Sequence, residues 1–488
     1  MISPVPPIRI TACNSNRVNN DGDFVLYWMI AARRPSWNFA LDRAVEWSMK
    51  TKKPLLVLEA VRCDYPWASE RIHAFVLEGM ANNAGELTKA PALYYPYVER
   101  VNGEGKGLVE ALSSNACVIV TDDFPCFFIP SMIKAAAKKV RVFMEKVDAN
   151  GLIPLRLSEK VFQSAYHFRR FSQKNLLGLL RQQPKALPFA GLKLKALEAI
   201  PKHVSKRWPS LVFEQKAGIR GLLDTLPIDH LVRPVRYCGG LREARSTLNI
   251  FMEKRLPFYK EYRNHADQDA ESGLSPYLHF GHISSHEIVQ TILDGNSWSP
   301  ENCPGKASGQ REGWWGVDEN SEAFLDQLIT WRELGFQFCQ KRNDYDKYES
   351  IPSWALKTLQ DHSKDMRPSV YTLKEFEEAR THDPLWNAAQ KQLLEDGVIH
   401  NYLRMLWGKK IVHWSPTPRD ALQFMERLNN RYALDGRDPN SYTGIFWVLG
   451  RHDRAWGPER AIFGKVRYMS SENTRRKVRL KRYLEKWA

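Results

Sequence analysis

The chain has 488 residues, 43% of them hydrophobic and 11% aromatic, and a formal net charge of +16. This length exceeds the usual size of a single core, so we expect two domains and room for a large buried pocket. The composition excludes a disordered protein. The positive charge favours a polyanionic partner, because Lys and Arg displace counterions from phosphates, although a solvated basic surface would give the same charge.

Seven cysteines are scattered along the chain without a CxxC pair, which excludes the usual zinc and redox motifs and favours a reducing cytoplasm. No secretion signal and no apolar run of about 18 residues is present, so neither export nor a membrane span is expected. Walker, HExxH and GxSxG motifs are absent as well. His282 and His286 have the spacing of a helical metal pair, but no third ligand accompanies them, so no metal site is predicted.

Residues 1–160 alternate short apolar runs with longer amphipathic stretches. This pattern predicts an α/β domain, with a Rossmann-like parallel sheet covered by helices. The apolar face of residues 37–49 predicts a helix between the first two strands. The strands are expected at residues 24–29, 55–60, 92–98, 117–121 and 140–145.

Residues 161–232 are rich in Lys, Arg and Pro and, apart from a helical stretch at 162–182, lack periodicity, which predicts an interdomain linker. The helical period dominates the rest, for example at 400–414, so residues 233–488 are expected to form an all-α domain. The polar composition of residues 296–320 predicts an exposed loop.

Six segments stand out in the second half of the chain: SPYLHFGHISS (275–285), THDPLWNAAQ (381–390), NYLRMLWGKKIVHW (401–414), NRYALDGRDPN (430–440), HDRAWG (452–457) and GKVRYMS (464–470). In order and spacing, they resemble the FAD-binding domain of class II photolyases. The first half is similar more loosely, through FVLYWM and VDANGLIP. The resemblance implies a photolyase/cryptochrome fold and light-driven repair of cyclobutane pyrimidine dimers in DNA by electron transfer from excited reduced FAD.

For FAD, the resemblance implies an Arg–Asp pair and an Asn around the isoalloxazine ring, where fixed charges tune the reduced flavin. The pyrophosphate needs donors of the kind that the start of a helix supplies, although serines at such a place also serve as ordinary caps. The Arg–Asp pair would equally fit a structural ion pair. The residues implied are Ser272, Leu274, Ser275, Asn387, Arg404, Asn429 and Asp435.

Three tryptophans match an electron relay of the family: Trp407, Trp386 and Trp414. Trp407 and Trp414 are seven residues apart on one predicted helix, which places them about 10 Å apart on one face. From spacing alone, aromatic core packing is the better explanation. The coincidence with the family's relay favours electron transfer.

A lesion pocket is implied by Arg263, Trp331, Tyr402, Met405 and Trp447, because aromatic faces and a cation suit a flipped dimer. The sequence departs from class II photolyases at Gln327, where they have a Glu that bonds to the dimer. An amide can still donate to a pyrimidine carbonyl. Two further departures are the missing DQR run in AARRPSWNFAL from residue 31 and the WVLGRHD loop from residue 447, which is one residue short.

The expected partner is double-stranded DNA that contains UV lesions, with the basic stretch 475–486 as a possible phosphate contact. We expect a cytoplasmic monomer without a membrane contact. A second chromophore of the deazaflavin or folate type is possible in the first domain. The main alternative is a cryptochrome-like blue-light photoreceptor, which the Gln at residue 327 favours and the rest of the pocket opposes. A flavin-free nucleic-acid-binding protein is the third possibility.

Overall fold

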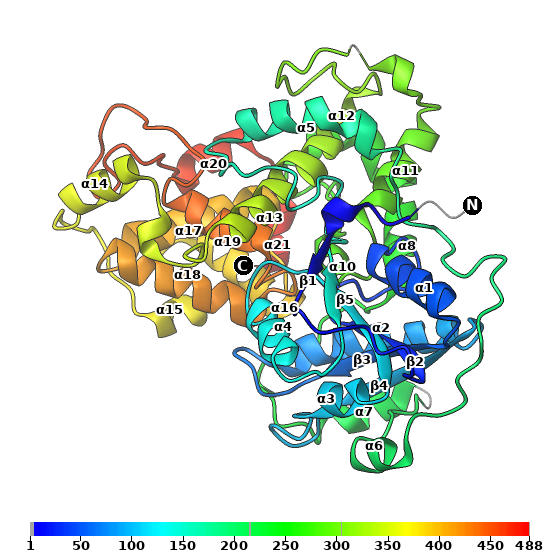
Figure 1. The fold of residues 1–488 in the computed structure, drawn as a ribbon. Coiled ribbons are helices and arrows are strands. Elements are labelled where there is room, and N and C mark those ends of the chain that lie inside the picture. Colours follow the sequence, from blue (N-terminus) through cyan, green and yellow to red (C-terminus); the bar gives the residue numbers. More distant parts are fainter. Residues whose placement is uncertain (1–3, 214–215, 304, 488) are drawn as a thin grey trace. The chain divides into compact units, whose positions relative to one another are not determined.

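The computed structural model describes residues 4–213, 216–303 and 305–487 (Figure 1). By contacts between residues, the chain forms two compact units, and each unit is built from three separate segments. The sheet unit comprises Met1–Ser158, Asn175–Leu248 and Leu274–Gly295. The helical unit comprises Glu159–Lys174, Asn249–Gly273 and Asn296–Ala488. The three domain ranges expected from the sequence stay a prediction.

The sheet unit contains a six-stranded sheet in the order β1-β6-β5-β2-β3-β4, parallel except for the antiparallel pairing of β1 with β6. Apolar clusters cover both faces, so the central strands are almost continuously hydrophobic. The expected α/β fold is confirmed. The strands are β1 (Ile10–Ala12), β2 (Phe24–Met29), β3 (Leu55–Val61), β4 (Ala92–Val98), β5 (Ala116–Asp122) and β6 (Met144–Val147).

Most predicted strands agree with the structure to within a residue, but β6 begins at Met144, four residues later than expected. Val140 and Val142 are buried in the core without joining the sheet, which explains why their apolar character resembled a strand. The first helix, α1 (Phe39–Thr51), begins two residues later than predicted. Its N-cap is Asn38, whose side chain accepts hydrogen bonds from the backbone N–H groups of Ala40 and Leu41.

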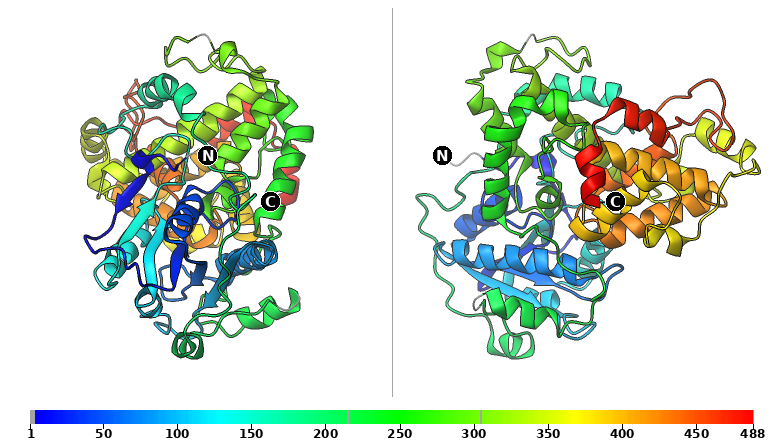
Figure 2. Two further views of the ribbon diagram at one scale, coloured as in Figure 1. Left: turned by 45° about the vertical axis from the view of Figure 1, so that its right-hand side comes forward. Right: turned by 180° about the vertical axis from the view of Figure 1, so that it is seen from behind.

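Helices surround this sheet in several short segments (Figure 2). The predicted linker contains α6 and α7. The helical stretch expected at 162–182 is α5 (Ala165–Leu179), whose residues up to Lys174 belong to the helical unit. The other helices of this region are α2 (Glu70–Leu87), α3 (Leu108–Ser113), α4 (Ile129–Ala137), α6 (Lys202–Arg207), α7 (Lys216–Leu223), α8 (Leu241–Ile250), α10 (Ser275–His279) and α11 (Ser285–Gly295).

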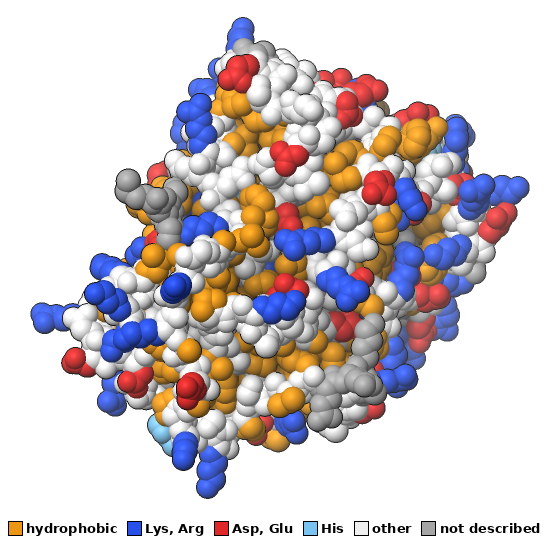
Figure 3. Space-filling view, turned by 90° about the vertical axis from the view of Figure 1, so that its right-hand side faces the viewer, with side chains coloured by type: hydrophobic (Ala, Val, Ile, Leu, Met, Phe, Trp, Pro, Cys, Tyr) orange, Lys and Arg blue, Asp and Glu red, His pale blue; other side chains and the backbone are white. Residues whose placement is uncertain are grey.

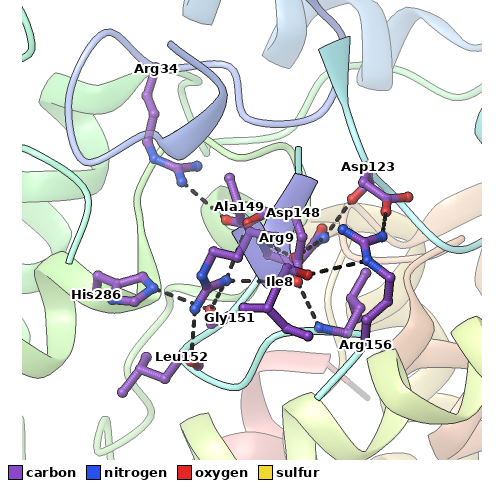
Figure 4. A network of polar contacts seen from close by, with 12 residues as sticks. Ile8, Arg9, Arg34, Asp123, Asp148, Ala149, Gly151, Leu152, Arg156 and His286 are labelled. Carbon is purple, nitrogen blue, oxygen red and sulfur yellow. Dashed lines mark hydrogen bonds and ion pairs between the residues drawn. The ribbon is translucent and has the colours of Figure 1, made fainter. Parts of the chain in front are cut away.

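A buried polar network fixes the loop after β6 (Figure 4). Arg9, which is 1% exposed, donates to the carbonyl oxygens of Asp148, Gly151 and Leu152 at 2.8 to 3.2 Å. His286 lies 3.2 Å from the Gly151 carbonyl oxygen through Nε2. Because these groups satisfy the backbone of residues 148–152, the loop is part of the core of the sheet unit.

The two histidines that had the spacing of a metal pair are both buried. Gly240 donates its N–H to Nδ1 of His282, and burial lowers the pKa of His282 to about 3. The helix α11 begins only at Ser285, so the two residues are not successive turns of one helix. Both histidines therefore belong to the core.

The helical unit contains helices from three parts of the chain, and α17, α18 and α19 pack on one another (Figures 1 and 2). The expectation of an all-α second domain is confirmed. Its elements are η2 (Phe251–Arg255), η3 (Leu256–Phe258), α9 (Tyr259–Tyr262), α12 (Glu319–Leu325), η5 (Asp326–Trp331), α13 (Arg332–Lys341), α14 (Ser353–Asp361), α15 (Leu373–Glu377), α16 (Pro384–Asp396), α17 (Asn401–Trp414), α18 (Pro418–Tyr432), α19 (Pro439–Val448), α20 (Ser471–Lys477) and α21 (Lys481–Trp487).

Most described residues of 296–320 are exposed or partly exposed, as expected, but the expectation is wrong for two tryptophans. Trp314 and Trp315 are buried, and the Glu322 carboxylate accepts hydrogen bonds from the backbone N–H groups of both residues and of Gly313. The polar composition of the segment gave no sign that these two tryptophans would be buried. They anchor the segment within the helical unit.

One face of the surface is shown in Figure 3, where Lys and Arg side chains are spread among acidic and hydrophobic ones. Among the described residues, no helix has the length and apolar character that a membrane span requires.

Candidate functional site

Helix α17 presents two kinds of surface along its length. Its first turns carry the partly exposed Tyr402, Arg404 and Met405, whereas Trp407 and Trp414 further along are buried. One helix therefore joins the side chains predicted to meet cofactor and lesion with those predicted to carry electrons.

The predicted Arg–Asp pair is formed. Nη2 of Arg404 lies 3.0 and 3.1 Å from the two carboxylate oxygens of Asp435, and the side chains are 24% and 12% exposed. A guanidinium and a carboxylate side by side offer N–H donors and oxygen acceptors at one place. This donor set suits a ring that carries both an N–H and carbonyl groups.

The two asparagines have different surroundings. Asn429, on α18, is buried and donates through Nδ2 to Oγ of Ser441 at 2.7 Å. The Asn387 amide accepts from the N–H and hydroxyl of Thr381 and donates to the Thr381 carbonyl oxygen. Asn387 therefore fixes the turn before α16, a role that its side chain bonds explain without a cofactor.

The residues expected at the pyrophosphate lie where the chain passes from one unit to the other. Ser272 belongs to the helical unit, and Leu274 and Ser275 belong to the sheet unit. Ser275 is the exposed first residue of α10, which has only five residues, and Leu274 is the buried N-cap. The helix expected near Ile283 begins two residues later, at Ser285.

The three relay tryptophans form a continuous row of rings. Trp386 stacks on Trp407 with ring centroids 6.5 Å apart and an interplanar angle of 4°, and it meets Trp414 at 6.2 Å and 72°. All three are at most 2% exposed. Trp386 therefore bridges the gap between two residues of α17 that lie two turns apart.

Hydrogen bonds fix the orientation of the row. Nε1 of Trp386 donates to the Trp407 carbonyl oxygen at 3.0 Å, and Nε1 of Trp407 donates to Oε1 of Gln390 at 2.9 Å. Sequence analysis did not identify Gln390, although it lies four residues after Trp386 and so shares its face of α16.

Trp414 lies among polar and aromatic groups. The ring centroid of His382 is 4.9 Å away and that of Tyr371 is 5.7 Å away. Nζ of Lys410 lies 4.9 Å from the Trp414 ring centroid and 3.4 Å from a carboxylate oxygen of Asp383, the N-cap of α16. The Lys410–Asp383 pair was also missed from the sequence, because its partners are 27 positions apart.

Trp331 and Trp447 stack on each other, with ring centroids 4.8 Å apart and an angle of 21°. Both are partly exposed, unlike the relay tryptophans. Trp331 ends η5, a π-helical segment that also contains Gln327. Single π-helical turns inside α-helices occur frequently at functional sites. The pair is thus an accessible aromatic surface of the kind that bases stack on.

Arg263 follows α9, and its guanidinium lies 5.6 Å from the Tyr259 ring centroid. Burial raises the pKa of Tyr259 to about 12, so the ring stays neutral beneath the cation. Arg263 is partly exposed.

The C-terminal end of α19 is capped by a buried lysine. Nζ of Lys409 donates to the Val448 carbonyl oxygen at 2.6 Å, next to Trp447. Burial lowers the pKa of Lys409 to about 7. An amine N–H satisfies one of the carbonyl oxygens that a helix leaves without a partner at its C-terminus, whether the amine is charged or neutral. Lys409 therefore fixes the end of the helix that carries Trp447.

No protein-family model matches the chain. A deoxyribodipyrimidine photo-lyase of Methanothermobacter thermautotrophicus is 32% identical over 479 residues, which are 98% of this chain and 97% of that protein. A bacterial class III photolyase from Agrobacterium tumefaciens superposes with a TM-score of 0.67 at 18% identity, over 96% of this chain and 86% of the other. An archaeal photolyase from Sulfolobus tokodaii, solved with two FAD molecules, gives 0.59 at 14%, over 95% and 90%.

The sheet unit and the helical unit together define the fold of a photolyase or cryptochrome. With full-length identity above 30%, the chain belongs to the photolyase/cryptochrome family. The family membership expected from the sequence is confirmed. The assignment to class II and the roles of the individual residues stay predictions.

Proposed function

We propose that this protein is a light-driven DNA lyase that splits cyclobutane pyrimidine dimers. The observation that carries the proposal is the stacked, partly exposed pair Trp331 and Trp447 beside a π-helical segment that contains Gln327. The full-length similarity to a deoxyribodipyrimidine photo-lyase supports it. The substrate is double-stranded DNA with UV lesions, which agrees with the net charge of +16.

The cofactor is FAD. The Arg404–Asp435 pair offers donors and acceptors that fit the edge of a flavin ring, and its partial exposure leaves it accessible to a ligand. By the family resemblance, Asn429 of the helical unit would meet the flavin ring, and Ser272, Leu274 and Ser275 would provide the phosphate contacts. Reduced FAD supplies an electron to the dimer after it absorbs light.

The protein's own side chains bind and orient the lesion. A dimer is unreachable inside the base stack, so it must be flipped out, at a cost of a few kcal/mol. Trp331 and Trp447 offer aromatic faces for the flipped bases, Met405 and Tyr402 would complete the pocket, and Arg263 would replace the dimer in the duplex. Gln327 donates an amide N–H to a pyrimidine carbonyl oxygen.

The relay has a separate task. Trp407, Trp386 and Trp414 would pass electrons one at a time from an external reductant to oxidised FAD, which needs two electrons and a proton to reach its reduced, active form. They take no part in bond splitting, because the electron that opens the ring returns from the repaired bases. There is no net redox change in the repair reaction.

The proposal also covers the compartment, the oligomeric state and a second chromophore. The seven cysteines are all free thiols, which suits a reducing cytoplasm. The protein acts on DNA as a monomer. A deazaflavin or folate type of chromophore in the sheet unit would extend light absorption, and the second FAD of the Sulfolobus tokodaii structure shows that a relative can hold another flavin.

The decisive experiment is loss of thymine dimers from UV-irradiated duplex DNA under blue light, with the flavin fully reduced beforehand. Dimers should disappear in the light and persist in a dark control. Purified protein should be yellow and show flavin absorbance, which a flavin-free DNA-binding protein would lack. Flavin binding with photoreduction but no dimer loss would favour the cryptochrome-like photoreceptor instead.

A further inference from the structure

An arginine on α5 is tied to the π-helical segment η5. Nε and Nη2 of Arg169 lie 2.6 and 3.0 Å from the two carboxylate oxygens of Asp326, the first residue of η5. The two side chains are 7% and 11% exposed. Paired N–H groups of a guanidinium on both oxygens of a carboxylate make a directional link as well as a charge pair.

The same face of α5 also holds the 296–320 segment. Nη1 of Arg169 donates to the Gly309 carbonyl oxygen at 3.3 Å. One turn further along, the Gln173 amide accepts from the Gly309 N–H at 2.7 Å and donates to the Gln310 carbonyl oxygen at 3.0 Å. Arg169 and Gln173 thus join two parts of the chain to one helix: the 296–320 segment, which we call the insert, and η5. We call this set of contacts the brace.

Gly309 fits this arrangement tightly. Its φ is +79°, a left-handed conformation that favours glycine. A Cβ at Gly309 would lie 2.9 Å from the ring of Tyr166 and 3.2 Å from Cβ of Arg170, both on α5. The insert therefore lies as close to α5 as a residue without a side chain permits.

The brace bears on the lesion site because of what η5 contains. The π-helical hydrogen-bond pattern is rare and appears mostly as single turns. Asp326 begins it, Gln327 is the next residue and Trp331 is the last. A buried carboxylate that lost its arginine would be an uncompensated charge, so the segment would rearrange to expose it.

We propose that Arg169 is a positioning residue for lesion recognition: through Asp326 it holds η5 in the π-helical form that presents Gln327 and Trp331 together. The inference rests on the proposed function for the identity of the ligand. It assigns a specific role to a helix from the stretch that the sequence suggested was a linker. Arg169 itself touches neither lesion nor cofactor.

The test compares Arg169→Gln with Arg170→Gln, since Arg170 is the exposed neighbour on the same helix. The first readout is hydrogen exchange of the peptide that covers residues 326–331, which does not depend on activity. The second is affinity for duplex DNA with one thymine dimer, measured against undamaged duplex. FAD content and photoreduction are recorded as controls.

Arg169→Gln should speed exchange in η5 and weaken discrimination of the lesion about five- to thirtyfold, because a lost contact of about 1–2 kcal/mol changes an equilibrium constant by that factor. Arg170→Gln should match the wild type in both. Arg169→Lys keeps one charge contact and should recover part of the loss. Asp326→Asn combined with Arg169→Gln should be no worse than the more damaging single change, since both break one link.

Wild-type exchange and wild-type lesion discrimination in Arg169→Gln would overturn the proposal. If Arg169→Gln fails to fold, Asp326→Asn weakens the same link from its other side and should give the same two changes, and their absence would overturn it equally. If the wild type does not split dimers, the proposed function fails, whereas faster exchange in η5 would still support the brace.

Discussion

Replacement of Gly335 by Ala should loosen the contact between α13 and α19 and separate Trp331 from Trp447. A Cβ at Gly335 would lie 2.7 Å from Oγ1 of Thr443 and 2.8 Å from the Pro439 carbonyl oxygen, both closer than carbon normally approaches. The carbonyl is backbone, so relief requires a shift of one helix. Trp331 precedes Gly335 by four residues and Trp447 follows Thr443 by four, so the clash lies one turn from the ring stack.

The magnitude follows from two opposing effects. Overpacking of a well-packed contact costs about 1–3 kcal/mol. Alanine in the interior of a helix recovers about 0.5–1 kcal/mol relative to glycine. The net free energy of unfolding should fall by about 1–2 kcal/mol, which lowers the melting temperature by a few degrees, about 2–4 °C per kcal/mol.

Gly444 supplies the matched control. It lies on α19, and a Cβ there would meet nothing within 4 Å. Gly444→Ala should therefore leave the melting temperature unchanged or raise it slightly. Thermal unfolding followed by circular dichroism measures both variants, and the near-UV signal reports on the stacked tryptophans. If Gly335→Ala is as stable as Gly444→Ala and keeps the wild-type near-UV signal, the packing argument is refuted.

Three further predictions concern the relay, the lesion site and the sheet unit. Trp386→Phe should reduce flavin photoreduction severely, because the row loses its middle ring, while repair by chemically reduced enzyme persists. Gln327→Glu should change the repair quantum yield only modestly, because an ionised carboxylate must be protonated before it can donate at the same place. Burial raises the pKa of Asp42 from 3.8 to about 7, so its contribution to stability is present below pH 4 and is lost as the pH rises through about 7. In Asp42→Asn that fall in melting temperature over pH 4 to 8 should disappear.

Each of these has a contrary outcome. Photoreduction of Trp386→Phe at the wild-type rate would remove that residue from the relay. No dimer splitting by the wild type, together with recovery in Gln327→Glu, would mean that the family's carboxylate is required. A pH dependence that is the same in Asp42→Asn and wild type would show that other groups set the acid–base behaviour of the sheet unit.

Local sequence patterns predicted the strands of the sheet well. They predicted the first residues of the helices only approximately. The strand at Phe24–Met29 is an uninterrupted apolar run, and such runs are typical of strands covered on both faces. The start of α1 was placed too early because Trp37 is apolar and fits the helical period. Its φ of 49° excludes it from the helix. The periodicity of apolar residues in a sequence does not reveal such a backbone conformation.

The relay could be expected from sequence only through resemblance. Spacing placed Trp407 and Trp414 on one helix, but Trp386 comes from α16, and its place between them is a tertiary property. The same holds for Arg169 and Asp326, which are 157 positions apart. Long-range pairs of this kind depend on how the helices pack, and helix packing cannot be read from a single sequence.

Each unit is made of three separate segments of the chain, and this affects how the protein can fold while the ribosome synthesises it. The sheet unit includes Leu274–Gly295, so it cannot be completed until more than half of the chain has left the ribosome. By then Glu159–Lys174 and Asn249–Gly273 have also emerged, without the rest of the helical unit that they belong to. Domains generally fold as units from the N-terminus during synthesis, but here the sheet unit has to wait for its last segment at Gly295, and the helical unit has to wait for the end of the chain. A truncation after β6 would therefore lack two of the three segments of the sheet unit, so the sheet is not expected to fold on its own.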